Sequence, residues 1–167
     1  KILSVGAVII LLFSATLFGY LLPLLQQKIL EEKETMLKNI MDMAVSAMED
    51  TYAAEYSQKA DAEEAKARLI RLVKHFRYGP EGKDYIWIND FHPRMIMHPF
   101  VEDLNGKDIT DYKDPKGKRL FVEMVEVCRS PEKSGYVNYY WQWKDNKDKI
   151  VPKISYVRTF DKLGWIV

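Results

Sequence analysis

The sequence is poor in the residues that most catalytic and metal sites need. It has one cysteine, Cys128, and three histidines in 167 residues. No intramolecular disulfide can form, and no third and fourth ligands stand at zinc-like spacing from His92 and His98. Cys128 ends an apolar run, so a packed thiol and a nucleophile are the alternatives, and no basic partner for a nucleophile is evident. Phosphate-binding loops and hydrolase motifs are also missing. We therefore expect no catalytic residue, metal or cofactor.

An excess of charge of one sign is absent as well. The chain has 25 basic and 24 acidic residues, which gives a net charge of +1. No block of lysine and arginine is dense enough to follow a phosphate backbone. This composition argues against nucleic acid as a partner.

Charged residues are missing altogether from residues 2–25. Such a run is long enough to cross a hydrocarbon core as a helix. No small-residue cleavage site follows it, so residues 1–25 are predicted to be a transmembrane helix rather than a removed signal. Only Lys1 precedes the run, and charge therefore does not predict its orientation.

Glycine and proline are absent from residues 26–76, which is typical of helices. A stalk helix is expected over residues 26–60. Its narrow apolar stripe packs on its own domain or pairs with a second copy, and its members are Leu37, Ile40, Ala44, Ala47 and Thr51. The segment Asp61-Ala-Glu-Glu64 is typical of a capping box, which predicts a second helix. The expected inner face of that helix is Ala65, Leu69, Leu72 and Phe76.

Short extended runs separated by turns follow residue 79, so residues 61–167 are expected to form one α+β domain. A strand is predicted over 85–89, a turn over 90–94 and a second strand over 95–98. Asp114-Pro115 is typical of a helix start, and this helix is expected to reach Cys128. The chain ends inside an extended run at Val167, and we expect the natural domain to continue beyond it.

The most aromatic stretch, residues 134–157, predicts a β-hairpin with a loop over 144–149. Alternation places Val137, Tyr139, Trp141 and Trp143 on one face and Tyr136, Asn138, Tyr140 and Gln142 on the other. With aromatic rings on both faces, one face is expected to meet the core. The other lines a small-ligand pocket, or its tyrosines are core residues with satisfied hydroxyls.

Basic residues and donors near this hairpin favour an anionic ligand. Arg77 can clamp a carboxylate with two hydrogen bonds, and Lys153 adds a point charge. The alternatives are a surface salt bridge for Arg77 and a structural pair for Lys153. Strict alternation places Lys153 and Tyr156 on opposite faces, so both reach one ligand only if a bulge lies between them.

Eight ordered segments resemble the single-Cache (sCache, Cache type 2) extracytoplasmic sensor domain of bacterial chemoreceptors and sensor histidine kinases. They are Arg77-Tyr-Gly79, Tyr85-Ile-Trp-Ile-Asn-Asp90, Met95-Ile-Met-His-Pro99, Gly106-Lys-Asp108, Asp114-Pro-Lys-Gly117, Gly135-Tyr-Val-Asn-Tyr-Tyr-Trp141, Pro152-Lys-Ile-Ser-Tyr156 and Gly164-Trp165. Their order and spacing follow the family over residues 77–167. The apolar run and the long helix before them complete the layout.

The resemblance implies a PAS-like antiparallel sheet with a long N-terminal helix packed on it, behind one transmembrane helix in the inner or plasma membrane. The sensor domain would face the periplasm or exterior and form a homodimer through the long helix. Its ligand would be a small organic acid, a short monocarboxylate such as acetate, propionate, pyruvate or lactate. The implied ligand-binding positions are Arg77, Tyr85, Trp87, His98, Tyr139, Trp141, Lys153 and Tyr156.

Other functions stay open beside this one. A structural or dimerisation module would have the same fold without a ligand. A sensor for an amino acid or an amine, and a membrane-tethered hydrolase, are further alternatives. The output of the receptor, whether chemotactic, kinase or cyclase, is left open.

Overall fold

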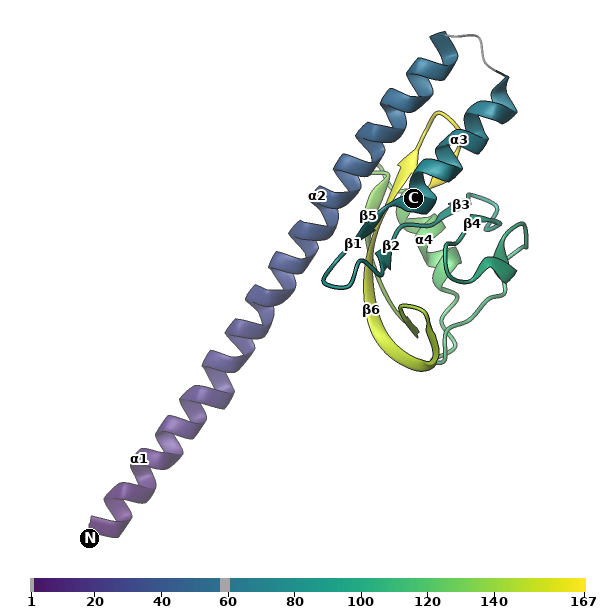
Figure 1. Ribbon diagram of the computed structural model, residues 1–167. Coiled ribbons are helices and arrows are strands. Elements are labelled where there is room, and N and C mark those ends of the chain that lie inside the picture. Colours follow the sequence, from purple (N-terminus) through teal and green to yellow (C-terminus); the bar gives the residue numbers. More distant parts are fainter. Residues whose placement is uncertain (1, 58–60) are drawn as a thin grey trace. The chain divides into compact units, whose positions relative to one another are not determined.

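The computed structural model describes residues 2–57 and 61–167 (Figure 1). They belong to two units, Lys1–Leu37 and Lys38–Val167, and each is described by itself. The expected boundary between stalk and sensor, at residues 60 and 61, borders residues 58–60, which lie outside the described residues.

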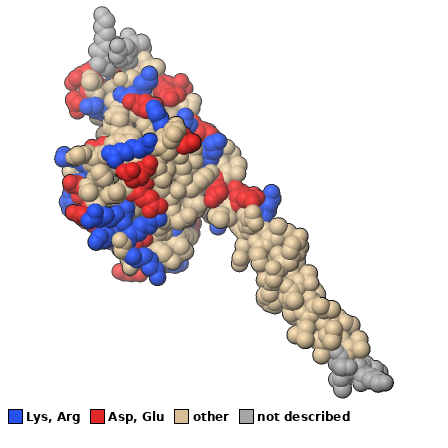
Figure 2. Space-filling view, turned by 180° about the vertical axis from the view of Figure 1, so that it is seen from behind, with Lys and Arg blue, Asp and Glu red and all other residues tan. Residues whose placement is uncertain are grey.

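The first unit is helical. It contains α1 (Ile2–Thr16), a π-helical turn η1 (Leu17–Leu21) and the beginning of α2 (Leu22–Ser57). Pro23 has no N–H, and the Leu22 N–H bonds to the Leu17 carbonyl, which explains why the helix widens here. In the described residues one helical stretch, Val5–Glu55, is long and apolar enough to cross a membrane. Figure 2 shows that the part of this helix before Lys28 carries no charged residue on its surface.

In the second unit, α2 buries Met41, Ala44, Val45 and Met48. Of the stripe expected from the sequence, Ala44 is buried and the other members are half-buried, so the stripe flanks the core face of α2 rather than forming all of it. Ile40 and Ala47 lie half-buried at the edge of the contact, and the Thr51 hydroxyl bonds to the Ala47 carbonyl of its own helix. Two faces of α2 are partly apolar, and only the packing against the sheet decides which one enters the core.

The second helix, α3 (Ala62–His75), begins where the sequence predicted. The Asp61 side chain accepts a hydrogen bond from the Glu63 N–H, whereas Glu64 pairs with Arg68 at 2.8 Å instead of closing the capping box. Ala65 and Leu69 are buried as expected. Val73 is buried as well, while Leu72 and Phe76 are only half-buried.

The sheet of the second unit is antiparallel and has the strand order β4-β3-β7-β6-β5. Its strands are β3 (Ile88–Asp90), β4 (Met95–Met97), β5 (Ser134–Trp143), β6 (Asn146–Phe160) and β7 (Trp165–Ile166). A separate two-stranded sheet pairs β1 (Arg77–Tyr78) with β2 (Asp84–Tyr85). The single strand predicted over 85–89 was wrong, because the chain changes sheets after Tyr85.

Helices cover both faces of the sheet. One core lies between the sheet and helices α2 and α3, and includes Met48, Leu69 and Phe160. The other lies under α4 (Leu120–Cys128) and the preceding loop, and includes Met124, Val137 and Trp141. The chain thus has an α+β fold with a long N-terminal helix and an antiparallel sheet.

The β5–β6 hairpin keeps one register from Ser134 to Gln142, with Tyr139 opposite Lys153 and Tyr136 opposite Tyr156. This register has no bulge between Lys153 and Tyr156, so they project from opposite faces. The register shifts only at Gln142 and Trp143, where Trp143 becomes exposed. The face that carries Val137, Tyr139 and Trp141 is the buried one, whereas Trp143, which the sequence placed on the same face, is exposed.

The helix predicted to start at Asp114 starts instead at Leu120. Asp114 Oδ1 accepts the N–H groups of Lys116 and Lys118, each at 2.9 Å, and Oδ2 accepts the Tyr140 N–H at 3.0 Å. Burial raises the pKa of this carboxyl, but the three backbone donors outweigh it and leave the pKa below its usual range. The aspartate holds a turn against β5 rather than capping a helix, because side-chain capping and turn closure use the same local bonds.

Candidate functional site

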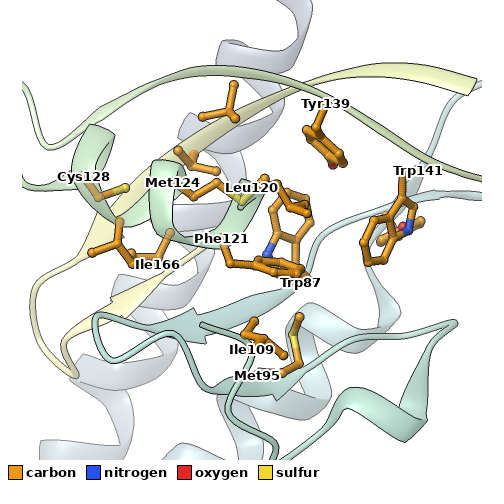
Figure 3. Packing of buried hydrophobic residues seen from close by; sticks show 14 residues of the cluster. Trp87, Met95, Ile109, Leu120, Phe121, Met124, Cys128, Tyr139, Trp141 and Ile166 are labelled. Atoms are coloured by element: carbon orange, nitrogen blue, oxygen red, sulfur yellow. The ribbon is translucent and has the colours of Figure 1, made fainter. Parts of the chain in front are cut away.

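A small cavity lies between the sheet and α4, in the second unit. Its lining residues are Tyr85, Trp87, His98, Leu120, Phe121, Tyr139 and Trp141 (Figure 3). The cavity measures about 10 Å³, which is room for about one water molecule. The structure therefore brings together five residues that the sequence placed in one pocket: Tyr85, Trp87, His98, Tyr139 and Trp141.

His98 is held by the loop that follows β4. Its Nδ1 accepts the N–H groups of Phe100 at 3.2 Å and Val101 at 2.9 Å, and its own backbone N–H donates to Asn105 Oδ1. These bonds assign the ring proton to Nε2. Burial, helped by the nearby Lys153 ammonium, lowers the pKa of His98 to about 3. The imidazole is therefore neutral and offers one N–H donor.

Two further rings of the cavity are fixed by hydrogen bonds. The Trp87 indole N–H donates to Asn89 Oδ1 at 3.0 Å, and the Tyr139 hydroxyl bonds to Ser155 Oγ at 2.8 Å. The pairing of Trp87 with Asn89 confirms that they share a face, as the sequence predicted. Burial raises the pKa of Tyr139 above its usual range, so this hydroxyl stays protonated.

Trp141 is different, because its buried Nε1 has no hydrogen-bond partner among the described residues. Burial raises the pKa of the nearby Tyr85 hydroxyl above its usual range, and the Trp141 N–H offsets part of this rise. The two groups do not reach hydrogen-bond geometry, so the N–H remains without a partner. A buried N–H without an acceptor costs about 1–3 kcal/mol. Trp141 lines the cavity, so a ligand acceptor that reached its N–H would satisfy this donor.

Lys153 lies next to the cavity rather than in its lining. Its ammonium lies 4.8 Å from the centre of the Tyr85 ring, which is also in edge contact with His98 at 4.9 Å. Burial lowers the pKa of Lys153, and the Asp84 carboxylate offsets part of the effect. A desolvated cation therefore stands beside the neutral donors.

Arg77 and Tyr156 do not join this group. The Arg77 guanidinium is exposed, donates to the Phe76 carbonyl at 2.7 Å, and lies 5.2 Å from the centre of the Phe100 ring. Tyr156 lies on the other face of the sheet, where its hydroxyl donates to Ser134 Oγ at 2.9 Å and its ring pairs with Tyr136 at 4.8 Å.

Leu120 and Phe121 line the cavity, although the sequence placed them only within the helix expected from Asp114 to Cys128. Both are almost fully buried. The available signal was their place at the start of an apolar helix, and this does not distinguish a cavity wall from ordinary core.

Catalytic chemistry has little support in the described residues. No group of three or more His, Cys, Asp or Glu side chains is placed there to hold a metal ion. Burial raises the pKa of the Cys128 thiol to about 11, and it is therefore protonated at neutral pH.

Comparison with known proteins gives the family. A family model described as a Cache domain (dCache_2) matches residues 22–167. The methyl-accepting chemotaxis protein McpP of Pseudomonas putida is 32% identical over 137 residues, which cover 82% of this chain and 24% of McpP. The sensor histidine kinase MctS of Rhizobium johnstonii is 29% identical over 142 residues, which cover 85% of this chain and 29% of MctS.

Two solved structures share the fold. A structure titled "Structural basis for carboxylic acid recognition by a Cache chemosensory domain" has a TM-score of 0.75 and 35% identity, covering 84% of this chain and 92% of its own. A "Periplasmic sensor domain of chemotaxis protein" has a TM-score of 0.75 and 34% identity, covering 82% and 92%. This chain spans only about a quarter to a third of the length of its curated relatives. It belongs to the Cache family, as a non-catalytic, periplasmic sensor domain of the kind found in chemoreceptors and sensor histidine kinases.

Proposed function

We propose that this domain binds a short monocarboxylate, such as acetate, propionate, pyruvate or lactate, as the input of a transmembrane signalling receptor. The observation that carries the proposal is the buried Trp141 N–H, which has no partner among the described residues and belongs to a side chain that lines the same small cavity as the neutral His98. A carboxylate oxygen would accept from both donors. The Lys153 ammonium supplies the opposite charge that a desolvated anion needs.

The rest of the cavity suits a carbon chain of very few atoms. Trp87, Leu120 and Phe121 give it apolar walls. The Cache structure whose title names carboxylic acid recognition, at 35% identity, supports the same ligand class. Arg77 and Tyr156 have no role in this version of the site, because neither reaches the cavity.

A ligand-free structural or dimerisation module is the second candidate. The observation in its favour is the cavity volume of about 10 Å³, since side chains of the domain fill most of the space. A sensor for an amino acid or amine is a third candidate, for which Asp84 near Lys153 is the available carboxylate.

Replacement of Lys153 tests the proposed ligand. Lys153→Met keeps the length of the side chain and removes its charge. Lys149→Met is the matched control, because this cation on the same strand lies 5.0 Å from the exposed Trp143 ring instead. Hydrogen bonds to charged groups contribute about 1.5–3 kcal/mol, so Lys153→Met should weaken binding of a short acid by roughly 10- to 150-fold.

The measurement is calorimetric titration of the full chain in detergent with each of the four acids. The control should bind as the unmodified chain does. Equal affinities of the two methionine variants would reject the role of Lys153. Failure of the unmodified chain to bind any of these acids would favour the ligand-free module, and a matching panel of amino acids and amines would separate the third candidate.

The receptor role assigns parts to the other elements. Residues 1–25 anchor the chain in the membrane, and residues 61–167 form the sensor. The long helix pairs with a second copy through its second apolar stripe, Met36, Ile40, Met43 and Ala47, whose spacing of four and three is typical of paired helices. Met43 is 75% exposed, as expected of a residue that awaits a partner.

Strand β6 offers the path from ligand to helix. It carries Lys153 and, five residues later, Arg158, whose guanidinium pairs with Asp42 of α2 at 2.6 Å. Signalling would follow if the ligand stabilises one of two packings of the sheet against the helix more than the other. The output domain, chemotactic or kinase, belongs to the rest of the receptor.

A further inference from the structure

We propose that Leu120, in the first turn of α4, sets the longest carbon chain that the cavity accepts. This inference rests on the proposed function and adds a specificity-determining residue to it. Leu120 is 1% exposed and lines the cavity. Figure 3 shows it next to the Trp87 ring, on the side of the cavity that α4 covers.

Three of the seven residues that line the cavity are fixed by directional bonds. Trp87 is bonded to Asn89, Tyr139 to Ser155, and His98 to two backbone N–H groups. Moving any of these side chains would leave a buried polar group without its partner, which costs about 1–3 kcal/mol. A ligand larger than one water molecule will therefore displace another part of the wall.

The first turn of α4 is the best candidate for that part, because the remaining lining residues, Tyr85 and Trp141, are held by ring contacts with His98, Phe100 and Tyr112. Leu120 and Phe121 contact the cavity through apolar atoms only, and the N-cap residue Arg119 makes no side-chain capping bond. A helix start without a side-chain cap lacks a contribution of typically about 1 kcal/mol. Displacing this turn costs packing and, of the side-chain contacts, the solvent-exposed ion pairs Arg119–Asp111 at 2.9 Å and Lys118–Glu123 at 2.8 Å, which contribute little to stability.

Of the two residues on this turn, Phe121 is the more constrained. Its ring makes edge contacts with Tyr112 at 5.7 Å and Trp141 at 6.0 Å. Leu120 has no ring to form such pairs and is flexible beyond Cβ. The space that Leu120 yields therefore decides how many methylene groups fit, while the donors hold the acid group at the other end of the ligand.

The test compares Leu120→Ala with Leu69→Ala on the full chain. Leu69 is fully buried on α3, in the core on the other face of the sheet, so its truncation should destabilise the domain similarly without touching the cavity. Binding is measured by calorimetry with unbranched carboxylates of two to six carbons. One methylene in a tight pocket changes affinity by about 10-fold or more.

In the unmodified chain and in Leu69→Ala, affinity should fall by about this factor for each carbon beyond the longest acid that fits. Leu120→Ala should move that limit to acids two or three carbons longer, with at least a tenfold gain for them. Leu120→Val, which removes less volume and is less disruptive, should move the limit by about one carbon.

The outcomes separate the two proposals. If the unmodified chain binds short acids but both Leu120 variants keep its length profile, Leu120 does not set the limit and the proposed ligand class stands. If Leu69→Ala shifts the profile as much as Leu120→Ala, loss of stability rather than the wall is responsible, and the inference is overturned. If neither the unmodified chain nor any variant binds an acid, both proposals fail together.

Discussion

Individual side chains around the cavity are positioned before any ligand arrives. His98 is the clearest case, because its two backbone donors fix both the orientation of the ring and the nitrogen that carries the proton. A preorganised donor loses little freedom when a ligand binds, which favours affinity in a site with so few atoms.

The buried His98 also makes stability depend on pH. Its pKa falls from 6.5 to about 3 in the folded domain. Between these two values the unfolded chain takes up a proton that the folded domain excludes. The free energy of unfolding should therefore fall as the pH is lowered from about 6.5 toward 3, by about 1.4 kcal/mol per pH unit from this residue.

Urea denaturation at pH 7, 5 and 4 measures this dependence. His98→Asn keeps an acceptor near the position of Nδ1 and does not titrate, so its stability should fall less over the same pH range. Carboxylates titrate in both proteins, so the difference between the pH dependences of their unfolding free energies gives the contribution of His98. Parallel curves for the two proteins would contradict a buried neutral His98.

At the scale of elements, the β1–β2 hairpin depends on one glycine. Gly79 has a φ of +76°, and a Cβ on it would overlap the Asp84 carboxylate of the paired strand. This hairpin supplies Tyr85 to the cavity, and it is joined to the tip of the β5–β6 hairpin by Lys83–Asp145 and Lys144–Glu81 contacts of 3.2 and 3.4 Å. Its conformation therefore affects the site.

Gly82 provides the matched comparison for Gly79. It also has a positive φ, +61°, but a Cβ on Gly82 would meet no described atom within 4 Å, so Gly82→Ala should cost only the backbone strain, about 1 kcal/mol. Gly79→Ala should cost about 2–4 kcal/mol, because the Asp84 carboxylate must move as well. Chemical denaturation of both variants measures the difference in unfolding free energy. Equal losses of stability would show that Asp84 does not contact the added Cβ at residue 79.

At the scale of the whole molecule, the proposed dimer would cover the exposed stripe of α2. Met43→Cys in the full chain should form a disulfide between two copies in membranes under mild oxidation. Glu49→Cys should not form this disulfide. Glu49 is also exposed, but it lies six residues further along and therefore on another side of the helix. The native Cys128 does not interfere, because it is buried and burial raises its pKa to about 11.

Cross-linking is read as the fraction of dimer on a non-reducing gel. Adding acetate or lactate then tests signalling, since a shift in helix packing should change the Met43→Cys yield. Equal yields for the two cysteines would reject pairing through this stripe. A high Met43→Cys cross-linking yield that no acid changes would support the dimer but reject the proposed signal path.

The sequence was sufficient for features that depend on local pattern. Lack of glycine and proline predicted the long helix, Asp61 marked the start of α3, and alternation placed Tyr139 and Trp141 on the same face. The ordered motifs identified the Cache family, which the family model and the relatives confirm. These features follow from periods of 3.6 and 2 residues and from turn chemistry, which neighbouring residues alone determine.

Tertiary structure decided what depends on contacts between distant segments. Arg77 lies outside the cavity because its guanidinium packs over the Phe100 ring and donates to the Phe76 carbonyl, and Leu120 enters the cavity because Asp114 closes a turn and the helix begins only at Leu120. The core face of α2 and the side on which Tyr156 lies were likewise settled by packing. Local pattern shows that a face is apolar or aromatic, but only the three-dimensional arrangement shows what that face meets, since the deciding contacts join residues far apart in the chain.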